Sequence, residues 1–216
     1  EAAVLQGGRI PLKQGVVAGL GAIISIGSGA SVGREGPAVH IGASLASSLG
    51  QRLKLSRSLS LTLLGCGVAA AVSASFNAPI AGAFFALEVV IGHYALSAFA
   101  PVVIASVAGT IVARIHLGDF PAFVLGDFEL VSFLELPAFA LLGVVCAAIS
   151  VVFMRSILLT RSVWQRTNVP TWLRPAIGGA AVGALALVLP EILGVGYEAT
   201  DRALHDIHFP DSPEAA

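Results

Sequence analysis

The sequence predicts an all-α polytopic membrane protein whose helices are short, tilted and in part broken. Hydrophobic residues make up 56% of the 216 residues and charged residues only 12%, about half of the charged share that soluble domains carry. Several apolar segments fall short of the about 20 residues that a helix needs to cross a bilayer. Short apolar segments interrupted by glycine and proline are typical of transporters, whose helices end inside the membrane where protein or water surrounds them.

The first three candidate helices are recognised by their lack of charge. Residues 14–33 contain no ionisable side chain and many glycines. Residues 37–50 form a shorter apolar stretch that opens at Pro37. Proline is tolerated in the first turn of a helix, because the N–H that it lacks would be unpaired there anyway. Residues 58–76 are uncharged and rich in alanine, leucine, serine and glycine, so we expect a membrane helix.

Four further apolar segments follow. Residues 79–96, 98–115 and 175–190 have proline at or near their first position, and we place the start of the second of these near Pro101. Residues 133–160 form the longest candidate of the chain. Proline at so many starts indicates broken helices rather than a bundle of straight ones, which favours a transporter or channel over a receptor-like protein.

The charges of two connections predict an orientation in the membrane. The connection 117–135 carries acids and no Lys or Arg, whereas the connection 161–174 carries three arginines and no acid. Cytoplasmic loops are enriched in Lys and Arg, so we expect the second connection inside and the first outside. The acids of the first connection are Asp119, Asp127, Glu129 and Glu135.

A pentapeptide in the first part of the chain carries the strongest functional signal. It reads Gly33-Arg34-Glu35-Gly36-Pro37 and stands in a long stretch with almost no other charge. An acid within an apolar segment is costly, so it indicates a functional site. The glycines leave the backbone bare, and Pro37 predicts a helix start, where unpaired N–H groups and the positive end of the helix dipole attract anions. We therefore predict an anion-binding site at residues 33–37.

Glu35 lies at that same predicted helix end. Its carboxylate could occupy the anion site itself, and when protonated or turned aside it would leave the site to a free anion, as a gate. The alternative is a structural glutamate that caps the helix and pairs with Arg34. No phosphate loop, nucleophile elbow or paired catalytic carboxylates occur in the sequence, so we predict no enzyme, and we expect no cofactor and no metal site.

Two segments together resemble the CLC family of chloride channels and chloride/proton exchangers. The first is the pentapeptide at residues 33–37, and the second, some forty residues later, is Phe76-Asn77-Ala78-Pro79-Ile80-Ala81-Gly82. The resemblance covers residues 10–195 and implies the inverted-repeat fold of that family, here about helices E to K. In the second segment, Asn77, Ala78 and Pro79 would open the next helix.

The resemblance also implies a division of the chain. Residues 1–116 would be the later part of the first inverted half, 117–135 the external connection, 136–200 the start of the second half, and 201–216 a polar tail. The filter segments G-S-G-x-P and G-x-F-x-P of the family do not occur in the sequence. We therefore expect the chain to be a piece of a longer polypeptide.

By the same resemblance, Glu35 would be the gating glutamate, and the N–H groups of Arg34, Glu35 and Gly36 would face the outer anion site. The expected function is transport of chloride by voltage- or pH-gated, channel-like conduction. The expected partners are chloride, the lipid bilayer and a second copy of the chain in a homodimer, and the expected location is the cell membrane. The net charge of −1 gives no reason to expect nucleic acid.

The pair Glu88-Val89 bears on the coupling to protons. Exchangers similar to the best-known bacterial member of the family carry two adjacent acids here, and the second relays protons. Because valine at position 89 cannot carry a proton, the sequence favours passive conduction, and we interpret Glu88 as a structural acid hydrogen-bonded within the bundle. The alternatives are a chloride/proton antiporter and a non-conducting structural or regulatory membrane subunit.

Overall fold

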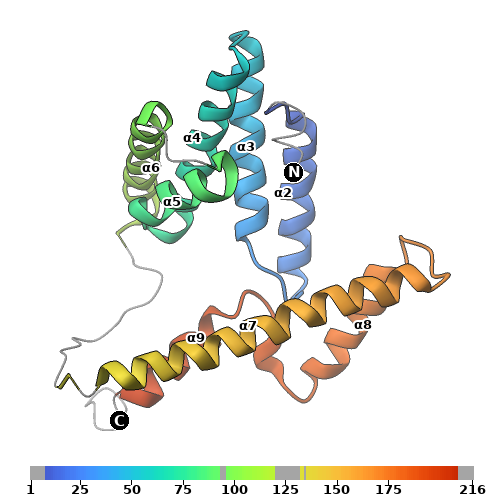
Figure 1. Cartoon of the computed structure of the whole chain (residues 1–216). Helices are drawn as coiled ribbons and strands as arrows, with labels where there is room; N and C mark the ends of the chain where they lie inside the picture. Colours follow the sequence, from blue (N-terminus) through green and yellow to red (C-terminus); the bar gives the residue numbers. More distant parts are fainter. Residues whose placement is uncertain (1–7, 93–95, 120–131, 134, 209–216) are drawn as a thin grey trace. The chain divides into compact units, whose positions relative to one another are not determined.

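The computed structural model describes residues 8–92, 96–119, 132–133 and 135–208. Within these ranges the chain is helical and forms no strand, which confirms the predicted all-α class. Figure 1 shows the helices along the chain, among which η1 is a π-helix and η2 a 3₁₀-helix. Their bounds are α2 Leu12–Gly27, α3 Glu35–Arg52, α4 Arg57–Phe76, α5 Pro79–Phe85, η1 Ala86–Ile91, α6 Leu96–Leu117, α7 Glu135–Arg166, α8 Arg174–Ala186, η2 Pro190–Ile192 and α9 Tyr197–His208.

The chain divides into two compact units. The first consists of residues 1–124 and 193–201 and contains α2 to α6, and the second consists of residues 125–192 and 202–216 and contains α7 and α8. The division falls within the connection for which the sequence predicts an external position. Two of the acids on which that prediction depends, Asp127 and Glu129, lie outside the described residues.

Two of the predicted proline starts are found at the first or second residue of a helix. Helix α5 begins at Pro79, and Pro175 is the second residue of α8. Pro101 lies inside α6 and not at its start, because the helix begins about one turn earlier, at Leu96. A proline this close to a helix start removes only one backbone hydrogen bond, the one to the carbonyl of Ser97, so the helix tolerates it.

The segment predicted as one helix over residues 79–96 is broken. Helix α5 gives way to the π-helix η1, which ends at Gly92. Gly92 has φ of +77°, a left-handed conformation that glycine adopts without steric cost. The first predicted helix, residues 14–33, likewise ends early, at Gly27, ahead of Gly29 with φ of +84°.

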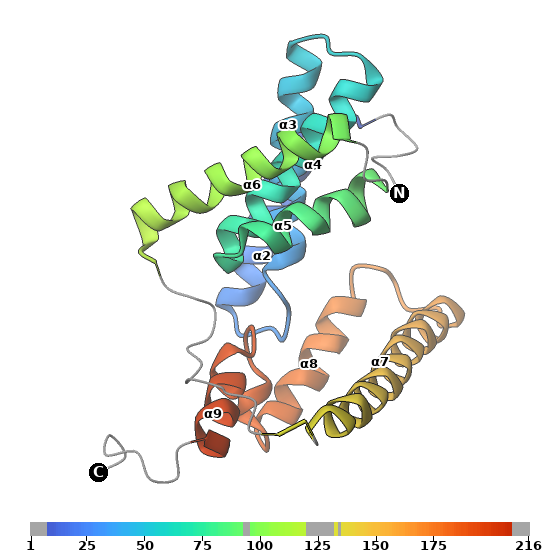
Figure 2. The same ribbon diagram turned by 60° about the vertical axis from the view of Figure 1, so that its left-hand side comes forward.

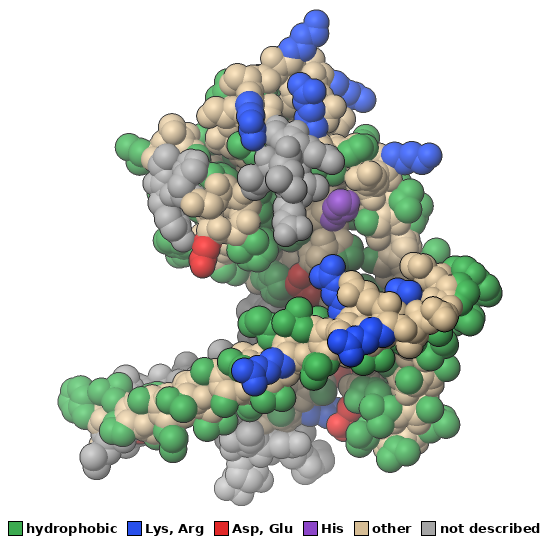
Figure 3. Space-filling model, turned by 45° about the vertical axis from the view of Figure 1, so that its right-hand side comes forward, with side chains coloured by type: hydrophobic (Ala, Val, Ile, Leu, Met, Phe, Trp, Pro, Cys, Tyr) green, Lys and Arg blue, Asp and Glu red, His purple; other side chains and the backbone are tan. Residues whose placement is uncertain are grey.

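Among the described residues, three helices are long and apolar enough to cross a membrane, namely α4, α6 and α7, while α2 and the combined segment Pro79–Ile91 are apolar but shorter. None of the residues of α7 is buried, and Figure 3 shows hydrophobic side chains along its exposed surface. A large exposed apolar surface marks a site of contact with a membrane or with other protein. The described part of the chain therefore confirms an integral membrane protein with both long and short apolar helices.

Helix α4 lies at the centre of the first unit, with α3, α5 and α6 around it (Figures 1 and 2). It approaches α3 most closely where Gly67 faces Gly42. A methyl group added to either glycine would collide with the carbonyl oxygen of the other, and also with Ala46 or Ala71. Small residues allow helix backbones to come this close, which is the usual mode of helix association in membranes.

The same mode of packing joins α4 to its other neighbours. Gly109 of α6 lies against the backbone of Ala70, and Gly82 of α5 lies against Ser73. The apolar side chains that fill the remaining core come from α4 and from the helices around it. They include Leu64, Val68, Ala69, Leu87 and Val102, each with a relative exposure of 1% or less.

Buried serine hydroxyls join α4, α5 and α6. The Ser73 hydroxyl lies 2.6 Å from the carbonyl oxygen of Ala69 and 2.5 Å from the hydroxyl oxygen of Ser106, and its one proton can be donated to either of them. Ser106 in turn donates to the carbonyl oxygen of Pro79, the first residue of α5. Both serines are fully buried, and a buried hydroxyl left without a partner costs about 1–3 kcal/mol. These bonds therefore hold the start of α5 in place between the two long helices.

We expect the substitution Gly67→Ala to destabilise the first unit. The added methyl would meet the carbonyl oxygen of Gly42, and such overpacking costs about 1–3 kcal/mol. Thermal unfolding of the intact protein in detergent should therefore have a lower midpoint. Gly21→Ala is the matched control, because it makes the same change inside α2 where nothing lies within 4 Å of the added methyl. Equal midpoints for the two variants would contradict the close packing of α3 on α4.

Candidate functional site

The pentapeptide forms the start of α3. The helix begins at Glu35, two residues before the predicted start at Pro37, and Arg34 precedes it as the N-cap residue. Within the described part of the chain, the N–H groups of Gly33, Arg34, Glu35 and Gly36 have no hydrogen-bond acceptor. Because Pro37 carries no N–H, it fits the first turn without loss of a bond. Four consecutive backbone donors are thus left open at the positive end of the helix dipole.

The carboxylate of Glu35 lies against the bare backbone of Gly33. A methyl group at Gly33 would collide with Oε2 of Glu35, so the glycine provides the space that the carboxylate fills. The Glu35 side chain is half-buried, and no group in the described ranges donates a hydrogen bond to it. It is therefore neither a cap for its own helix nor a member of an ion pair in this structure.

Arg34 turns away from Glu35. Its Nη2 donates to the carbonyl oxygen of Ser75 at 3.1 Å, and its guanidinium carbon lies 5.0 Å from the centroid of the Tyr197 ring. Ser75 is in the last turn of α4, where carbonyl groups lack helical partners and the dipole favours a cation. The structural alternative, in which Glu35 pairs with Arg34, is therefore wrong.

The segment Asn77-Ala78-Pro79 forms the turn between α4 and α5. Asn77 is the C-cap residue of α4 and has left-handed backbone angles, with φ of 54° and ψ of 33°. Ala78 is the N-cap residue of α5, and Pro79 is its first residue. Asparagine is one of the few residues other than glycine that adopts the left-handed region readily, so the turn depends on its identity.

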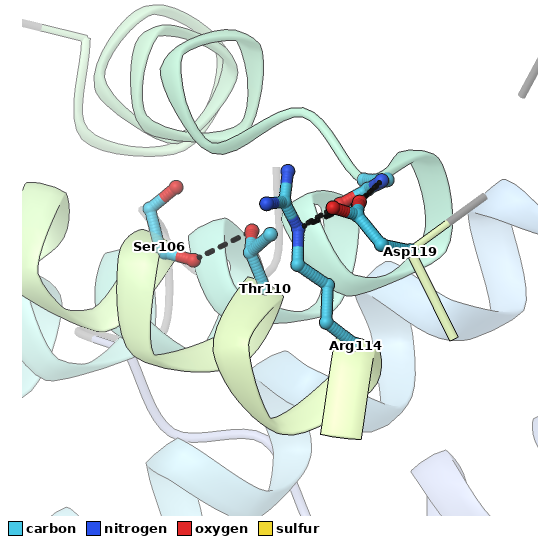
Figure 4. A network of polar contacts seen from close by, with 5 residues as sticks. Ser106, Thr110, Arg114 and Asp119 are labelled. Atoms are coloured by element: carbon cyan, nitrogen blue, oxygen red, sulfur yellow. Dashed lines mark hydrogen bonds and ion pairs between the residues drawn. The ribbon is translucent and has the colours of Figure 1, made fainter. Parts of the chain in front are cut away.

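Two side chains beyond this turn bind Asn77, and sequence reasoning missed both in this role. Nε of Arg114, in the last turn of α6, donates to Oδ1 of Asn77 at 2.7 Å, and Nδ2 of Asn77 donates to Oδ1 of Asp119 at 2.8 Å. The Arg114 Nε lies 3.1 Å from the same Asp119 oxygen (Figure 4). A signal was present, since Arg114 is the only Lys or Arg between Arg57 and Arg155.

A pocket of about 730 Å³ opens where the start of α3 meets the ends of α4 and α6. Its lining includes Arg34, Ser75, Asn77, Arg114 and Tyr197, and the remaining lining residues are apolar or glycine. Of the described residues that line it, two are arginines and none is Asp or Glu. Both arginines already have partners, since Arg34 donates to the Ser75 carbonyl and Arg114 Nε lies 3.1 Å from Oδ1 of Asp119, so the lining does not by itself attract an anion.

Glu88 and Val89 lie in the π-helix η1, apart from the α3 start. Val89 is 64% exposed. Glu88 is exposed too, and it makes no hydrogen bond within the described ranges, which differs from the interpretation of Glu88 as an acid bonded within the bundle. The expectation fails because the π-helix turns both side chains outward from the core that Ala86 and Leu87 enter.

The chain is similar in sequence to known proteins over nearly its whole length. A family model described as voltage gated chloride channel matches residues 1–211. A putative chloride channel protein, ClcB-like, of Ralstonia nicotianae is 34% identical over 209 residues, which are 95% of this chain and 49% of that protein. The chloride channel protein CLC-f of Arabidopsis thaliana is 34% identical over 199 residues, 88% of this chain and 26% of that protein.

A third relative is named as an exchange transporter and not as a channel. The H(+)/Cl(−) exchange transporter ClcA of Salmonella arizonae is 32% identical over 186 residues, 82% of this chain and 39% of that protein. The chain thus spans about half the length, or less, of the curated relatives that it matches.

We expect Arg34→Met to lower the free energy of unfolding by about 1 kcal/mol, the typical net worth of a hydrogen bond. Methionine keeps an unbranched apolar side chain but cannot donate to the Ser75 carbonyl. Arg52→Met is the control, because Arg52 lies on the same helix and makes no side-chain hydrogen bond within the described ranges. If the two variants unfolded at the same temperature in detergent, the bond from Arg34 to α4 would contribute nothing to stability.

Proposed function

The chain belongs to the CLC family of voltage-gated chloride channels, and on that premise we propose that the intact protein conducts chloride through a pore gated by Glu35. The family match covers residues 1–211. Membership shows an integral membrane protein of a chloride-transporting family. The role of Glu35 and the channel-like mode of transport are the parts that we propose.

The main support for the gate is that open backbone donors and the Glu35 carboxylate occur together at the start of α3. The N–H groups of residues 33–36 have no acceptor in the described part of the chain, and the Glu35 carboxylate beside them has no donor. Backbone N–H groups at a helix start bind anions without need of a formal cation. An anion that reaches this helix end finds donors already oriented toward it.

The gate follows from competition between two anions for one set of donors. Ionised Glu35 carries the same charge as chloride and lies within its own helix start, so it excludes chloride by occupation and by repulsion. Protonation removes the charge, and rotation of the side chain then costs little because no hydrogen bond from the described residues holds it. Acid on the outer side therefore favours the conducting state.

We place the gate on the outer side of the membrane because the start of α3 lies near the end of α6, which leads into the acidic connection. The pocket at the α3 start is also lined by Leu117 and Gly118, at the end of α6. The acidic connection 117–135 follows directly, and we propose that it is external by the positive-inside rule. We propose likewise that residues 1–116 belong to the first inverted half and 136–200 to the second, in a homodimer in the cell membrane.

A chloride/proton antiporter is the second candidate, favoured by the similarity to an H(+)/Cl(−) exchange transporter. Val89 favours the channel instead, since it places no titratable group at the position where a relay of protons would need one. Glu88 beside it is exposed and leaves an acid near that position. Both candidates share the gate, so they differ in coupling and not in the anion site.

The substitution Glu35→Gln in the intact protein should abolish most of the dependence on external pH and leave conduction. Glutamine resembles the protonated acid in shape and cannot ionise, so it never competes with chloride as an anion. Chloride efflux from proteoliposomes over a range of external pH measures both properties. Glu135→Gln, at the start of α7, is the control and should keep the parental pH profile. A parental profile in Glu35→Gln would refute the gate.

A chloride gradient should drive no stoichiometric movement of protons through the intact protein. The measurement follows proton uptake with a pH electrode while chloride leaves proteoliposomes of known capacity. A fixed ratio of protons to chloride would establish the antiporter in place of the channel. Absence of any chloride flux would instead favour a non-conducting subunit.

A further inference from the structure

We propose that Asn77, Arg114 and Asp119, the polar clamp, position the gate by keeping Arg34 bound to the end of α4 and away from Glu35. The proposal rests on the proposed role of Glu35. None of the three clamp residues belongs to the anion site at residues 33–37. Their effect would pass through α4 to Arg34, the direct neighbour of the gate in the chain.

The clamp is a closed triangle of side chains from three places in the fold. Asn77 is the C-cap residue of α4. Arg114 lies in the last turn of α6 and Asp119 follows that helix (Figure 4). The three bonds measure 2.7 Å from Arg114 to Asn77, 2.8 Å from Asn77 to Asp119, and 3.1 Å from Arg114 to Asp119. Since each residue contacts both others, the clamp ties the turn after α4 to the end of α6.

Asn77 suits the clamp both by its backbone conformation and by its side-chain amide. Its left-handed angles, φ of 54° and ψ of 33°, cost most residues strain but suit asparagine and glycine. Both polar atoms of its amide are used, Oδ1 as acceptor and Nδ2 as donor. A glycine at this position keeps the left-handed backbone and removes the side chain that bonds Arg114 and Asp119, which separates the clamp from the turn itself.

The end of α4 carries the effect to Arg34. Ser75, two residues before Asn77, offers the carbonyl oxygen that accepts from Arg34 Nη2 at 3.1 Å. That carbonyl is among the last four of α4, which have no partner within the helix. Its position depends on how the last turn is held, and the clamp holds the residue that ends this turn. A shift of the last turn would remove the acceptor that keeps the guanidinium in place.

A released guanidinium would find Glu35 as its nearest acid in the sequence. An arginine beside a carboxylate favours the ionised form, so more acid would be needed to open the gate. The other charged or titratable groups at this end of the unit include His40 on α3, Arg114 and His116 in the last turn of α6, Asp119 after it, and Tyr197 and Glu198 at the start of α9. The ends of α2 and α4 at this side carry none.

The test is Asn77→Gly in the intact protein, with chloride efflux measured against external pH. The charges stay the same and the left-handed backbone is kept. We expect the midpoint of activation to move to lower pH by about 0.5 unit, about threefold in proton activity. Asn168→Gly, in the connection after α7, is the matched control and should keep the parental midpoint, since the Asn168 side chain has no hydrogen bond in the described ranges.

A second variant tests the clamp independently, in case Asn77→Gly does not fold. Arg114→Lys preserves the charge but removes the planar guanidinium and its Nε donor, so we expect a shift in the same direction. A midpoint that stays parental, or moves to higher pH, in the folded variants would overturn the clamp.

Two backgrounds separate positioning from mere stability. In Arg34→Met there is no guanidinium to release, so Asn77→Gly should no longer shift the midpoint. In Glu35→Gln it should leave both the flux and its flat pH profile unchanged. Loss of flux by the same factor in Glu35→Gln as in the parent would show a structural role and overturn the proposal. If Glu35→Gln alone kept the parental pH profile of chloride efflux, the proposed gate would be refuted. If Glu35→Gln gave a flat profile but Asn77→Gly kept the parental midpoint, only the clamp would be refuted.

Discussion

The close contact of α3 with α4 is the interaction on which the first unit depends. Gly42 and Gly67 lie so near that neither position has room for a methyl group. Apolar side chains gain little by leaving lipid for protein, so membrane helices associate through close backbone contact and hydrogen bonds. Gly109 on α6 and Gly82 on α5 repeat this contact along α4. One helix thereby becomes the common neighbour of three others.

This packing explains why the start of one helix meets the ends of two others. Helices α3 and α4 run in opposite directions and are joined by residues 53–56, so the positive end of the α3 dipole lies next to the negative end of α4. Arg34 satisfies a carbonyl at the end of α4. The N–H groups at the start of α3 receive no such partner within the described ranges. The asymmetry leaves donors, and not acceptors, open at this place.

The same asymmetry separates a gate from a structural ion pair. Two residues adjacent in sequence with opposite charges would be expected to neutralise each other, yet Arg34 binds a residue 41 positions away. Glu35 has no hydrogen-bond or ion-pair partner among the described residues and lies beside open N–H groups. Instead of pairing with its neighbour, the exposed guanidinium of Arg34 contacts the carbonyl of Ser75 and the ring of Tyr197.

The sequence by itself determined the all-α membrane class, the family, the apolar segments and the likeness of residues 33–37 to an anion site at a helix start. These features follow from composition and from local rules for proline, glycine and helix ends. It could not determine that Pro101 lies inside α6, that a π-helix turns Glu88 outward, or that Arg34 and Arg114 bind around the end of α4. Those outcomes depend on contacts between residues far apart in the chain. Only the packing of helices around α4 brings Ser75, Asn77 and Asp119 within reach of the two arginines, because a hydrogen bond requires a distance that no sequence spacing specifies.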